Sequence, residues 1–464
     1  MLEAHRRDGD MSARCDIAIV GAGVVGCAIA REFSRYDLRT ILIEARSDLG
    51  DGASKGNSAI LSTGADTPFG TLECRLVTRG HERYLAEAPS LGLPFLATGS
   101  LTVAWNEDEM RRLHTLHDET LAAGFGSGSL VGPDAIYARA PDLAPGALGA
   151  IWEPDEGLVD PFSTPYAYAR DALANGVEFR ASSPVTAATR REGGWTLETP
   201  QGPIQAGIVV NCAGLWADRV ETISGYADFV GRPRRGQFLV YDKSARPLLD
   251  VIVKPVPSPT YRGILMAPTV FGNVLVGPTA EEIDDPDDWR TTREGLATLV
   301  EAAHRLLPAL AAHEITATYC GVRPGTDRPE YRIIPRAAEN WVTVAGIRST
   351  GLSGALGIAE HVAGLIVPGM KHAARKAATV PVRVPSLMAG GARPWQDSGD
   401  PAYGEIVCHC EGITRGEIRD AMASPLAPRS LRALKRRTRA MFGRCQGFHC
   451  AARVQSLFES LSAP

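Results

Sequence analysis

Four of the nine cysteines stand near the end of the chain, as Cys408-x-Cys410 and Cys445-x4-Cys450. Four thiolates bind either a structural Zn²⁺ ion or an iron-sulfur cluster. Zinc sites usually separate paired ligands by two to four residues, so the single residue between Cys408 and Cys410 fits zinc poorly. A 2Fe-2S cluster carries negative charge, which the basic segment 432–439 and nearby glycine N–H groups would offset. The spacing therefore favours a 2Fe-2S cluster over zinc and over a metal-free module.

A second group of residues suits phosphate chemistry. Gly21, Gly23 and Gly26 follow the apolar run 17–20 and open a helical pattern. Glycines at this spacing permit a tight turn, close approach of a pyrophosphate and close helix packing, and the helix N-terminus offers N–H groups to the anion. Glu44 lies 23 residues after Gly21, where an acid accepts a ribose hydroxyl. This indicates a dinucleotide with an unphosphorylated ribose, FAD or NAD but not NADP.

Two later segments favour FAD over NAD. The segment 52–64, GASKGNSAILSTG, is built from small and polar residues, as a chain passing close to a flavin ring requires. The segment 341–367 contains an apolar strand, a Gly-rich turn and a helix that opens near Ser353 and Gly354. The positive end of such a helix stabilises negative charge on a reduced flavin.

The length, charge and composition of the chain exclude several classes of protein. A chain of 464 residues exceeds one hydrophobic core and predicts about three folding units. The net charge of −4 argues against general nucleic-acid binding. The amino-terminal residues contain no apolar signal core, and no long apolar run predicts a membrane span. The other five cysteines are scattered through apolar or Gly-rich contexts, which predicts reduced thiols and a cytoplasmic protein.

These residues need a scaffold, and the apolar patterns predict it. A strand at 17–20, a helix and a strand at 40–43 form a nucleotide-binding unit. A helix at 165–174, a hairpin near 198–204 and a buried strand at 207–214 extend it. Strand patterns in GQFLVYD, GILMAPT and NVLVGPT predict an antiparallel sheet above the flavin.

The last hundred residues predict a linker and a helical module. Residues 369–403 are rich in Pro, Gly and basic side chains with weak periodicity, which is typical of a linker. Thr414 and Glu417 form a capping box for one helix, and Ser430 begins a second that includes Met441 on its apolar side. A third helix has apolar residues at Val454, Leu457 and Leu461.

Several motifs together resemble the D-amino-acid oxidase type of FAD-dependent oxidoreductase over residues 14–368. They are GAGVVG, NSAILSTG, VVNCAGLWAD, RRGQF, GVRPGTD and GIRSTGLSGA. Within that superfamily the chain is similar to the anaerobic glycerol-3-phosphate dehydrogenase and 2-hydroxyglutarate oxidase-like groups. The segment containing GRCQGFHC resembles the 2Fe-2S module of bacterioferritin-associated ferredoxin.

The resemblance implies an α/β fold: a Rossmann-type FAD-binding domain with an inserted antiparallel-sheet substrate domain, followed by a small all-α iron-sulfur module. The FAD domain would be discontinuous, at 14–80, 160–222 and 319–368. The substrate domain would comprise 81–159 and 223–318, and the module 404–464.

The resemblance also implies which residues contact FAD. The expected set comprises Gly21, Ala22, Gly23, Val24, Val25, Gly26, Glu44, Ala45, Arg46, Ser54, Asn57, Ser58, Val185, Ala213, Gly214, Trp216, Gly346, Gly351, Leu352 and Ser353.

The substrate site is expected to hold an anion. Arg323 in GVRP aligns with the region where similar proteins grip an anionic group, and Arg348, Arg262 and Tyr261 are further candidates. Similar proteins imply a His just before GNVLVGPT, but Phe271 stands there. Removal of a hydroxyl proton normally needs a positioned acceptor, so no base is assigned from the sequence.

These features together predict a dehydrogenase that oxidises a small anion of the glycerol-3-phosphate or 2-hydroxy-acid type by hydride transfer to FAD. Electrons would pass through the 2Fe-2S centre to a partner subunit or a quinone-linked carrier, because the cluster moves one electron at a time. Two alternatives stay open. One is oxidation of an amino or imino acid, such as a D-amino acid, a proline derivative or an opine, and the other is a non-catalytic electron-transfer subunit.

Overall fold

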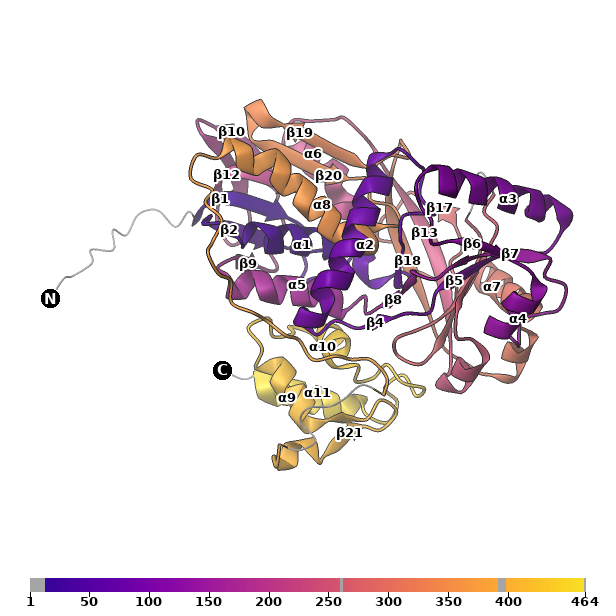
Figure 1. Ribbon diagram of the computed structural model, residues 1–464. Coiled ribbons are helices and arrows are strands. Elements are labelled where there is room, and N and C mark those ends of the chain that lie inside the picture. Colours follow the sequence, from indigo (N-terminus) through magenta and orange to yellow (C-terminus); the bar gives the residue numbers. More distant parts are fainter. Residues whose placement is uncertain (1–12, 259–261, 391–397, 463–464) are drawn as a thin grey trace.

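A computed structural model describes residues 13–258, 262–390 and 398–462. Two large sheets stand side by side, and a small helical module packs beneath the first (Figure 1). The first sheet has eight strands and the second nine.

The first sheet is centred on β1 (Ala13–Val20), whose last four residues are buried. It pairs in parallel with β2 (Thr40–Ile43) and β12 (Ile204–Asn211), and β12 pairs in parallel with β20 (Trp341–Ala345). Helices cover this sheet, so its central strands are continuously apolar. The remaining strands of this sheet are β9 (Glu178–Arg180), β10 (Ala187–Arg191), β11 (Gly194–Glu198) and β19 (Arg332–Arg336).

The helices beside this sheet include α1 (Val24–Phe33), α5 (Ser163–Ala174) and α8 (Gly351–Ile366). Helix α8 packs between α1 and α2 (Leu72–Leu91). By length and composition Gly351–Gly369 is apolar enough to span a membrane, but most of that window is buried inside the protein, as in a core helix. Helix α6 (Ala217–Ile223) follows β12.

The second sheet forms the predicted roof and is largely antiparallel. Its long pair is β13 (Gly231–Tyr241) with β18 (Ile315–Thr326). The segments GILMAPT and NVLVGPT form β15 (Leu265–Pro268) and β16 (Val274–Gly277), as predicted. The remaining strands are β5 (Ser100–Ala104), β6 (Ser129–Val131), β7 (Gly149–Glu153), β14 (Ile252–Pro255) and β17 (Glu281–Glu282). The helices beside them are α3 (Glu107–Ala122), α4 (Pro133–Arg139) and α7 (Arg293–Leu306).

Two predicted domain limits fall inside single elements. The limit at 80/81 divides α2, whose Tyr84 and Leu91 belong to the same core as α1 and α8. The limit at 318/319 divides β18, which pairs with β13 along nearly its whole length. A third, three-stranded sheet connects the two large parts through β3 (Ile60–Leu61), β4 (Phe95–Leu96) and β8 (Gly157–Val159).

The carboxyl-terminal module contains α9 (Arg415–Met422), α10 (Leu431–Thr438) and α11 (Ala451–Ser462). The Thr414–Glu417 capping box and the Ser430 cap are both present. Two details differ from the prediction. A short pairing of β21 (Ile406–Cys408) with β22 (Ile413–Thr414) makes the module not purely helical. Helix α10 ends at Thr438, because Arg439 takes a left-handed φ of 68°, so Met441 lies outside it.

Candidate active site and cluster site

The predicted FAD residues gather at one edge of the first sheet. Gly21 follows β1, Glu44 follows β2, Ala213 follows β12 and Gly346 follows β20. These four strands are neighbours and parallel, so their carboxyl ends lie together. Ligands of open α/β sheets bind at such an edge.

The Gly21 turn requires glycine on two grounds. Gly21 has a φ of +105°, and a Cβ on it would lie 2.5 Å from the carbonyl oxygen of Cys212. A Cβ on Gly26 would lie 1.9 Å from the carbonyl oxygen of Gly21. The turn and α1 are therefore packed backbone to backbone. Gly23 is the N-cap of α1 and offers no capping side chain, while the Val24 N–H donates to Ser54 Oγ at 2.9 Å.

Glu44 is fixed in a position suited to a ribose. Its two carboxylate oxygens accept from the Ala22 N–H at 2.9 Å and from the Arg46 N–H at 2.8 Å. Burial raises the pKa of Glu44, and the two backbone hydrogen bonds oppose that rise. A carboxylate has about four acceptor sites, so a sugar hydroxyl can be added to these two donors.

The first half of the predicted flavin-facing segment 52–64 is held by several short contacts. Asn57 Nδ2 donates to the Ser54 carbonyl at 2.8 Å, and the Tyr319 hydroxyl donates to the Asn57 carbonyl at 2.6 Å. A Cβ on Gly321 would lie only 1.8 Å from the Gly56 carbonyl oxygen, so this loop presses directly on β18. Ser58 lies in this loop and Ala45 follows Glu44, while Val185 packs against the core under the first sheet. Arg46 lies 5.0 Å from the centre of the Trp216 ring.

The amino-terminal end of α8 joins the loop that follows β3. Ser353, in the first turn of α8, accepts a 2.9 Å hydrogen bond from the Ser62 N–H and donates to the Ile60 carbonyl at 3.2 Å. The predicted residues Gly351 and Leu352 lie in this same first turn, and Gly346 precedes it with a φ of +69°. These contacts, the Gly21 turn and Glu44 fit FAD, whose pyrophosphate would be held by the Gly21 turn and whose ribose would be held by Glu44.

The predicted anion-binding residues lie on separate segments: Arg262 precedes β15, Arg323 lies on β18, and Arg348 lies between β20 and α8. Arg262 Nη1 donates to Asp66 Oδ2 at 3.0 Å. Burial raises the pKa of Tyr331, while the charges of Arg262 and Arg348 lower it. Arg323, on β18, donates to the Thr279 carbonyl at 3.4 Å. Tyr261 lies outside the described residues.

The structure adds a polar group that sequence reasoning missed. The Ser62 hydroxyl donates to Asp66 Oδ1 at 2.5 Å, beside the contact of Arg262 with Oδ2. Lys254, which is partly buried, donates to the buried carboxylate of Glu156 at 2.6 Å. Burial would raise the pKa of Asp66, but Arg262, Lys254 and the Ser62 hydroxyl outweigh it and hold that pKa below 3.8. Asp66 is therefore an ionised carboxylate whose side chain keeps about a third of its surface exposed.

Phe271 stands where a His was expected. Its apolar ring can neither accept nor donate a proton. It is 9% exposed and its ring packs 5.9 Å from the ring of Phe162. The guanidinium of Arg439, from the carboxyl-terminal module, lies 3.7 Å from the ring centre of Phe271. This position makes an interdomain contact.

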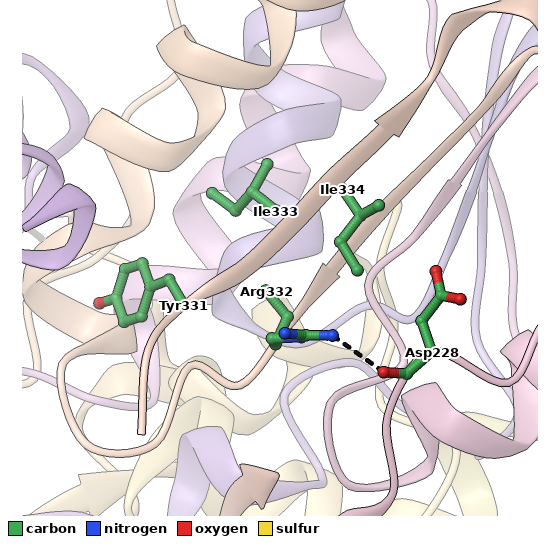
Figure 2. Close-up of a pocket in the computed structure, with 5 residues that line it drawn as sticks. All are labelled: Asp228, Tyr331, Arg332, Ile333 and Ile334. Atoms are coloured by element: carbon green, nitrogen blue, oxygen red, sulfur yellow. Dashed lines mark hydrogen bonds between the residues drawn. The ribbon is translucent and has the colours of Figure 1, made fainter. Parts of the chain in front are cut away.

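A surface pocket lies elsewhere, at the start of β19 (Figure 2). The side chains of Tyr331 and Arg332 extend in opposite directions there, and Arg332 donates to the Asp228 carbonyl at 2.9 Å. Among the residues that the structure describes, none of the predicted site residues lines this pocket. Tyr331 connects to the site by another route, because its hydroxyl lies 2.6 Å from Thr350 Oγ1 at the start of α8.

The four predicted cluster ligands meet as two pairs. Cys410 lies close enough to Cys445, and Cys450 close enough to Cys408, for the neighbouring thiol to alter the pKa of Cys410 and of Cys450. Over the described ranges, no three His, Cys, Asp or Glu side chains surround one metal-sized point. A tetrahedral zinc site needs four ligands around one ion, whereas in a 2Fe-2S cluster each of two irons takes two thiolates. Four thiols in two pairs fit a 2Fe-2S cluster.

The backbone around these thiols also suits an anionic cluster. Arg439, Met441 and Gln446 have left-handed φ angles of 68°, 69° and 49°, and Gly447 has 92°. Alternation of right- and left-handed residues turns successive N–H groups inward to form an anion-binding nest. Hydrogen bonds from the backbone of His449, Gly447 and Phe448 lower the pKa of Cys445. These residues fit a 2Fe-2S cluster held by Cys408, Cys410, Cys445 and Cys450.

The sheet-edge turn, the α8 terminus and the thiol module define a flavoprotein with an iron-sulfur module. The chain belongs to the FAD dependent oxidoreductase family, which matches residues 16–365. Residues 406–460 match the BFD-like [2Fe-2S] binding domain. FAD and a 2Fe-2S cluster are thus its cofactors, and it is an oxidoreductase.

Two curated relatives match nearly the whole chain, and a solved structure matches about four fifths of it. Glycerol 3-phosphate dehydrogenase of Caloramator mitchellensis is 35% identical over 445 residues, which cover 95% of this chain and 92% of the relative. One of the subunits of the anaerobic glycerol-3-phosphate dehydrogenase of Escherichia coli K12 is 28% identical, over 97% of this chain and 88% of the relative. The structure of dithionite-reduced L-alpha-glycerophosphate oxidase from Mycoplasma pneumoniae, with FAD bound, superposes with a TM-score of 0.74 at 25% identity. It covers 80% of this chain and 99% of the other.

Proposed function

We propose that this protein is an FAD-dependent dehydrogenase that oxidises glycerol 3-phosphate or a closely similar anionic alcohol. The observation that carries the proposal is the Ser62–Asp66 pair, which lies beside the first turn of α8 with Arg262 on the same carboxylate. An alcohol must lose its hydroxyl proton when its carbon loses a hydride, and Asp66 supplies an ionised acceptor. The 35% identity with a glycerol 3-phosphate dehydrogenase supports this substrate class.

Different residues of the chain would bind the anionic group of the substrate and accept its hydroxyl proton. The half-exposed guanidinium of Arg262 has five N–H donors, of which one contacts Asp66, so it can bind an anion while it positions that carboxylate. Arg348 adds a second positive charge near Tyr331. The proton would pass from the substrate hydroxyl to Ser62 and on to Asp66 along their 2.5 Å hydrogen bond. When bound, FAD accepts a hydride from a carbon atom next to oxygen or nitrogen.

The cluster module implies that the electrons leave the protein one at a time. We infer that the acceptor is a partner subunit or a quinone-linked carrier. The relative from Escherichia coli is named as one subunit of its enzyme, which supports a hetero-oligomer.

Oxidation of an amino or imino acid is the second candidate, favoured by the absence of a histidine at Phe271. A neutral amine donates a hydride without a base, so such an enzyme would need Asp66 only to bind its substrate. The two candidates therefore differ in their need for the Ser62–Asp66 pair.

Anaerobic stopped-flow mixing separates them. Glycerol 3-phosphate, 2-hydroxyglutarate, proline and D-alanine would each be mixed with the oxidised holoenzyme while flavin absorbance is followed. We expect rapid bleaching by glycerol 3-phosphate. Bleaching only by the amino or imino acids would contradict the proposal, and bleaching by none of the four, with reduction only by a partner protein, would favour the non-catalytic subunit.

A further inference from the structure

The carboxyl-terminal module is anchored to the FAD-binding part by buried ion pairs. From α10, Arg436 donates to Asp48 at 2.7 Å and to Asp51 at 2.7 Å, and Arg437 donates to Asp48 at 2.6 Å. The side chains of Asp48, Arg436 and Arg437 are all less than a tenth exposed. Buried ion pairs of this kind hold the module in one orientation against the FAD-binding part. Separating the two charges would leave a buried charge unpaired, which costs free energy.

The anchored loop is the one that carries the ribose-binding acid. Asp48 stands four residues after Glu44, and Asp51 also accepts from Lys55, beside Ser54. On the module side, Ser424 contacts the Tyr166 hydroxyl of α5 at 2.7 Å, and Leu426 is buried in the core of the FAD-binding part. The module is thus held against the elements that position FAD, as Figure 1 shows for α10 and α5.

Three phenylalanines cross this interface in a continuous line. The rings of Phe271 and Phe162 lie 5.9 Å apart, and those of Phe162 and Phe442 lie 5.3 Å apart, both stacked. Arg439 covers Phe271 at 3.7 Å and Phe442 at 5.3 Å, and its guanidinium is fixed by Glu411 at 2.9 Å. We name these three residues, Phe162, Phe271 and Phe442, the aromatic seam.

Each end of the aromatic seam lies next to a cofactor site. Phe271 belongs to a buried cluster with Leu158, against which Ile60 packs, and Ile60 is the residue whose carbonyl accepts from Ser353 at the start of α8. At the other end, Phe442 is followed by Gly443, where a Cβ would lie 2.2 Å from the Cβ of Cys410. Cys408 and Cys450 are the buried pair of the cluster site.

We propose that the aromatic seam positions the cluster on the flavin side of the molecule for electron transfer from the flavin. The inference rests on the proposed electron relay. Oxidation of one substrate molecule removes two electrons. A 2Fe-2S cluster held by the four cysteines would carry these electrons one at a time, so each turnover would need two transfers from the flavin. The seam residues are positioning residues, and Phe271 stands in the seam where similar proteins imply a histidine.

Substitutions of Phe442 test the inference. Phe442→Leu removes the stacked ring, Phe442→Tyr retains it, and Phe162→Leu removes its partner. Phe458→Leu is the matched control, because Phe458 packs against the module core on α11 and is not in the aromatic seam. The four variants are made in the full chain and loaded with both cofactors.

Two signals are followed after anaerobic mixing with glycerol 3-phosphate: flavin bleaching by absorbance and cluster reduction by freeze-quench EPR. We expect unchanged bleaching in every variant and at least a tenfold slower appearance of the EPR signal in Phe442→Leu and Phe162→Leu. Phe442→Tyr and Phe458→Leu should stay within about twofold of the wild type. Iron content and the cluster reduction potential should be unchanged, which separates positioning from loss of the cluster.

Equal EPR rates in Phe442→Leu, Phe162→Leu and the wild type would overturn the inference. If the leucine variants lose iron, Asp48→Asn loosens the same interface from the opposite side and should give the same slow phase. If glycerol 3-phosphate does not bleach the flavin, photoreduction by a deazaflavin supplies the electrons instead. The proposed substrate would then be wrong, while redistribution of electrons between flavin and cluster would still test the seam.

Discussion

The Ser62 hydroxyl donates a 2.5 Å hydrogen bond to Asp66, and this pair lies where the loop after β3 joins the first turn of α8. Arg262 contacts the other oxygen of the same carboxylate at 3.0 Å. A proton acceptor and an anion-binding cation are therefore joined in one arrangement, although no histidine is present at the position where similar proteins imply one.

Replacement of Asp66 should stop proton removal while FAD stays bound. We expect Asp66→Asn to lower the rate of flavin reduction by glycerol 3-phosphate by roughly 10² to 10⁴, the usual contribution of a general base. Ser62→Ala should have a smaller effect, since a water molecule can replace the hydroxyl. Stopped-flow absorbance measures both. Asp118→Asn, on the exposed face of α3, is the control, and a rate for Asp66→Asn equal to that of this control would exclude Asp66 as the base.

The pH dependence should differ from that of an enzyme with a histidine base. The pKa of Asp66 is held below 3.8, so its carboxylate is ionised throughout the range above that value and is protonated only as the pH falls through its lowered pKa. We therefore expect a kcat at saturating substrate that shows no base-limited fall between about pH 5 and 8. A histidine base would halve kcat near its ordinary pKa of about 6.5. A decline centred there would contradict the role of Asp66.

Substitution of Arg323 tests whether that arginine grips the anion. Arg323 lies on β18 and faces Gly236. A Cβ at position 236 would come within 2.7 Å of the Arg323 guanidinium, so glycine there leaves space for the arginine side chain. Lysine keeps the charge but loses the planar fork that binds a phosphate or carboxylate with two hydrogen bonds. We expect Arg323→Lys to raise KM at least tenfold with little change in kcat. Arg328→Lys, exposed on the loop after β18, should leave both constants unchanged.

Loss of one thiol should remove the cluster without removing FAD. Cys408→Ser takes a ligand from the buried pair, and we expect iron and acid-labile sulfide to fall from about two of each per chain to near zero. The flavin absorbance and the rate of flavin bleaching should persist. Cys320→Ser, a buried thiol on β18, is the control and should retain the cluster. Recovery of one zinc ion per chain and no iron from the wild-type protein would support a zinc site instead.

Local signals predicted much of the fold. The Gly21 turn, the strand at 40–43, the helix after Ser163 and the Thr414 capping box depend on neighbours in the sequence, and all are present. The end of α10 was missed, because a left-handed arginine gives no compositional signal of the kind that glycine gives. The 80/81 limit was also missed, since α2 continues unbroken into the core beside α8.

The polar group around Asp66 required the tertiary structure. Asp66, Glu156, Lys254 and Arg262 are separated by up to 196 positions, and each one alone is an ordinary charged residue. An available signal was the Ser62-x3-Asp66 spacing just after the flavin-facing loop. The role of Phe271 could not be inferred at all, because its partners Phe162 and Arg439 come from a distant helix and from another module.

The two thiol pairs differ in their solvent exposure and therefore in their sensitivity to oxidants. Cys408 is 1% exposed and Cys450 is 3% exposed, whereas Cys410 is exposed and Cys445 is partly so. Oxidants and alkylating reagents reach the outer pair first, and Cys445 also has the lowered pKa that makes a thiol reactive. In iron-free protein treated with limiting iodoacetamide, mass spectrometry should find label on Cys445 and Cys410 before Cys408 and Cys450. Air would then damage the cluster site from its solvent side first, while the buried thiols of Cys408 and Cys450 stay intact for repair.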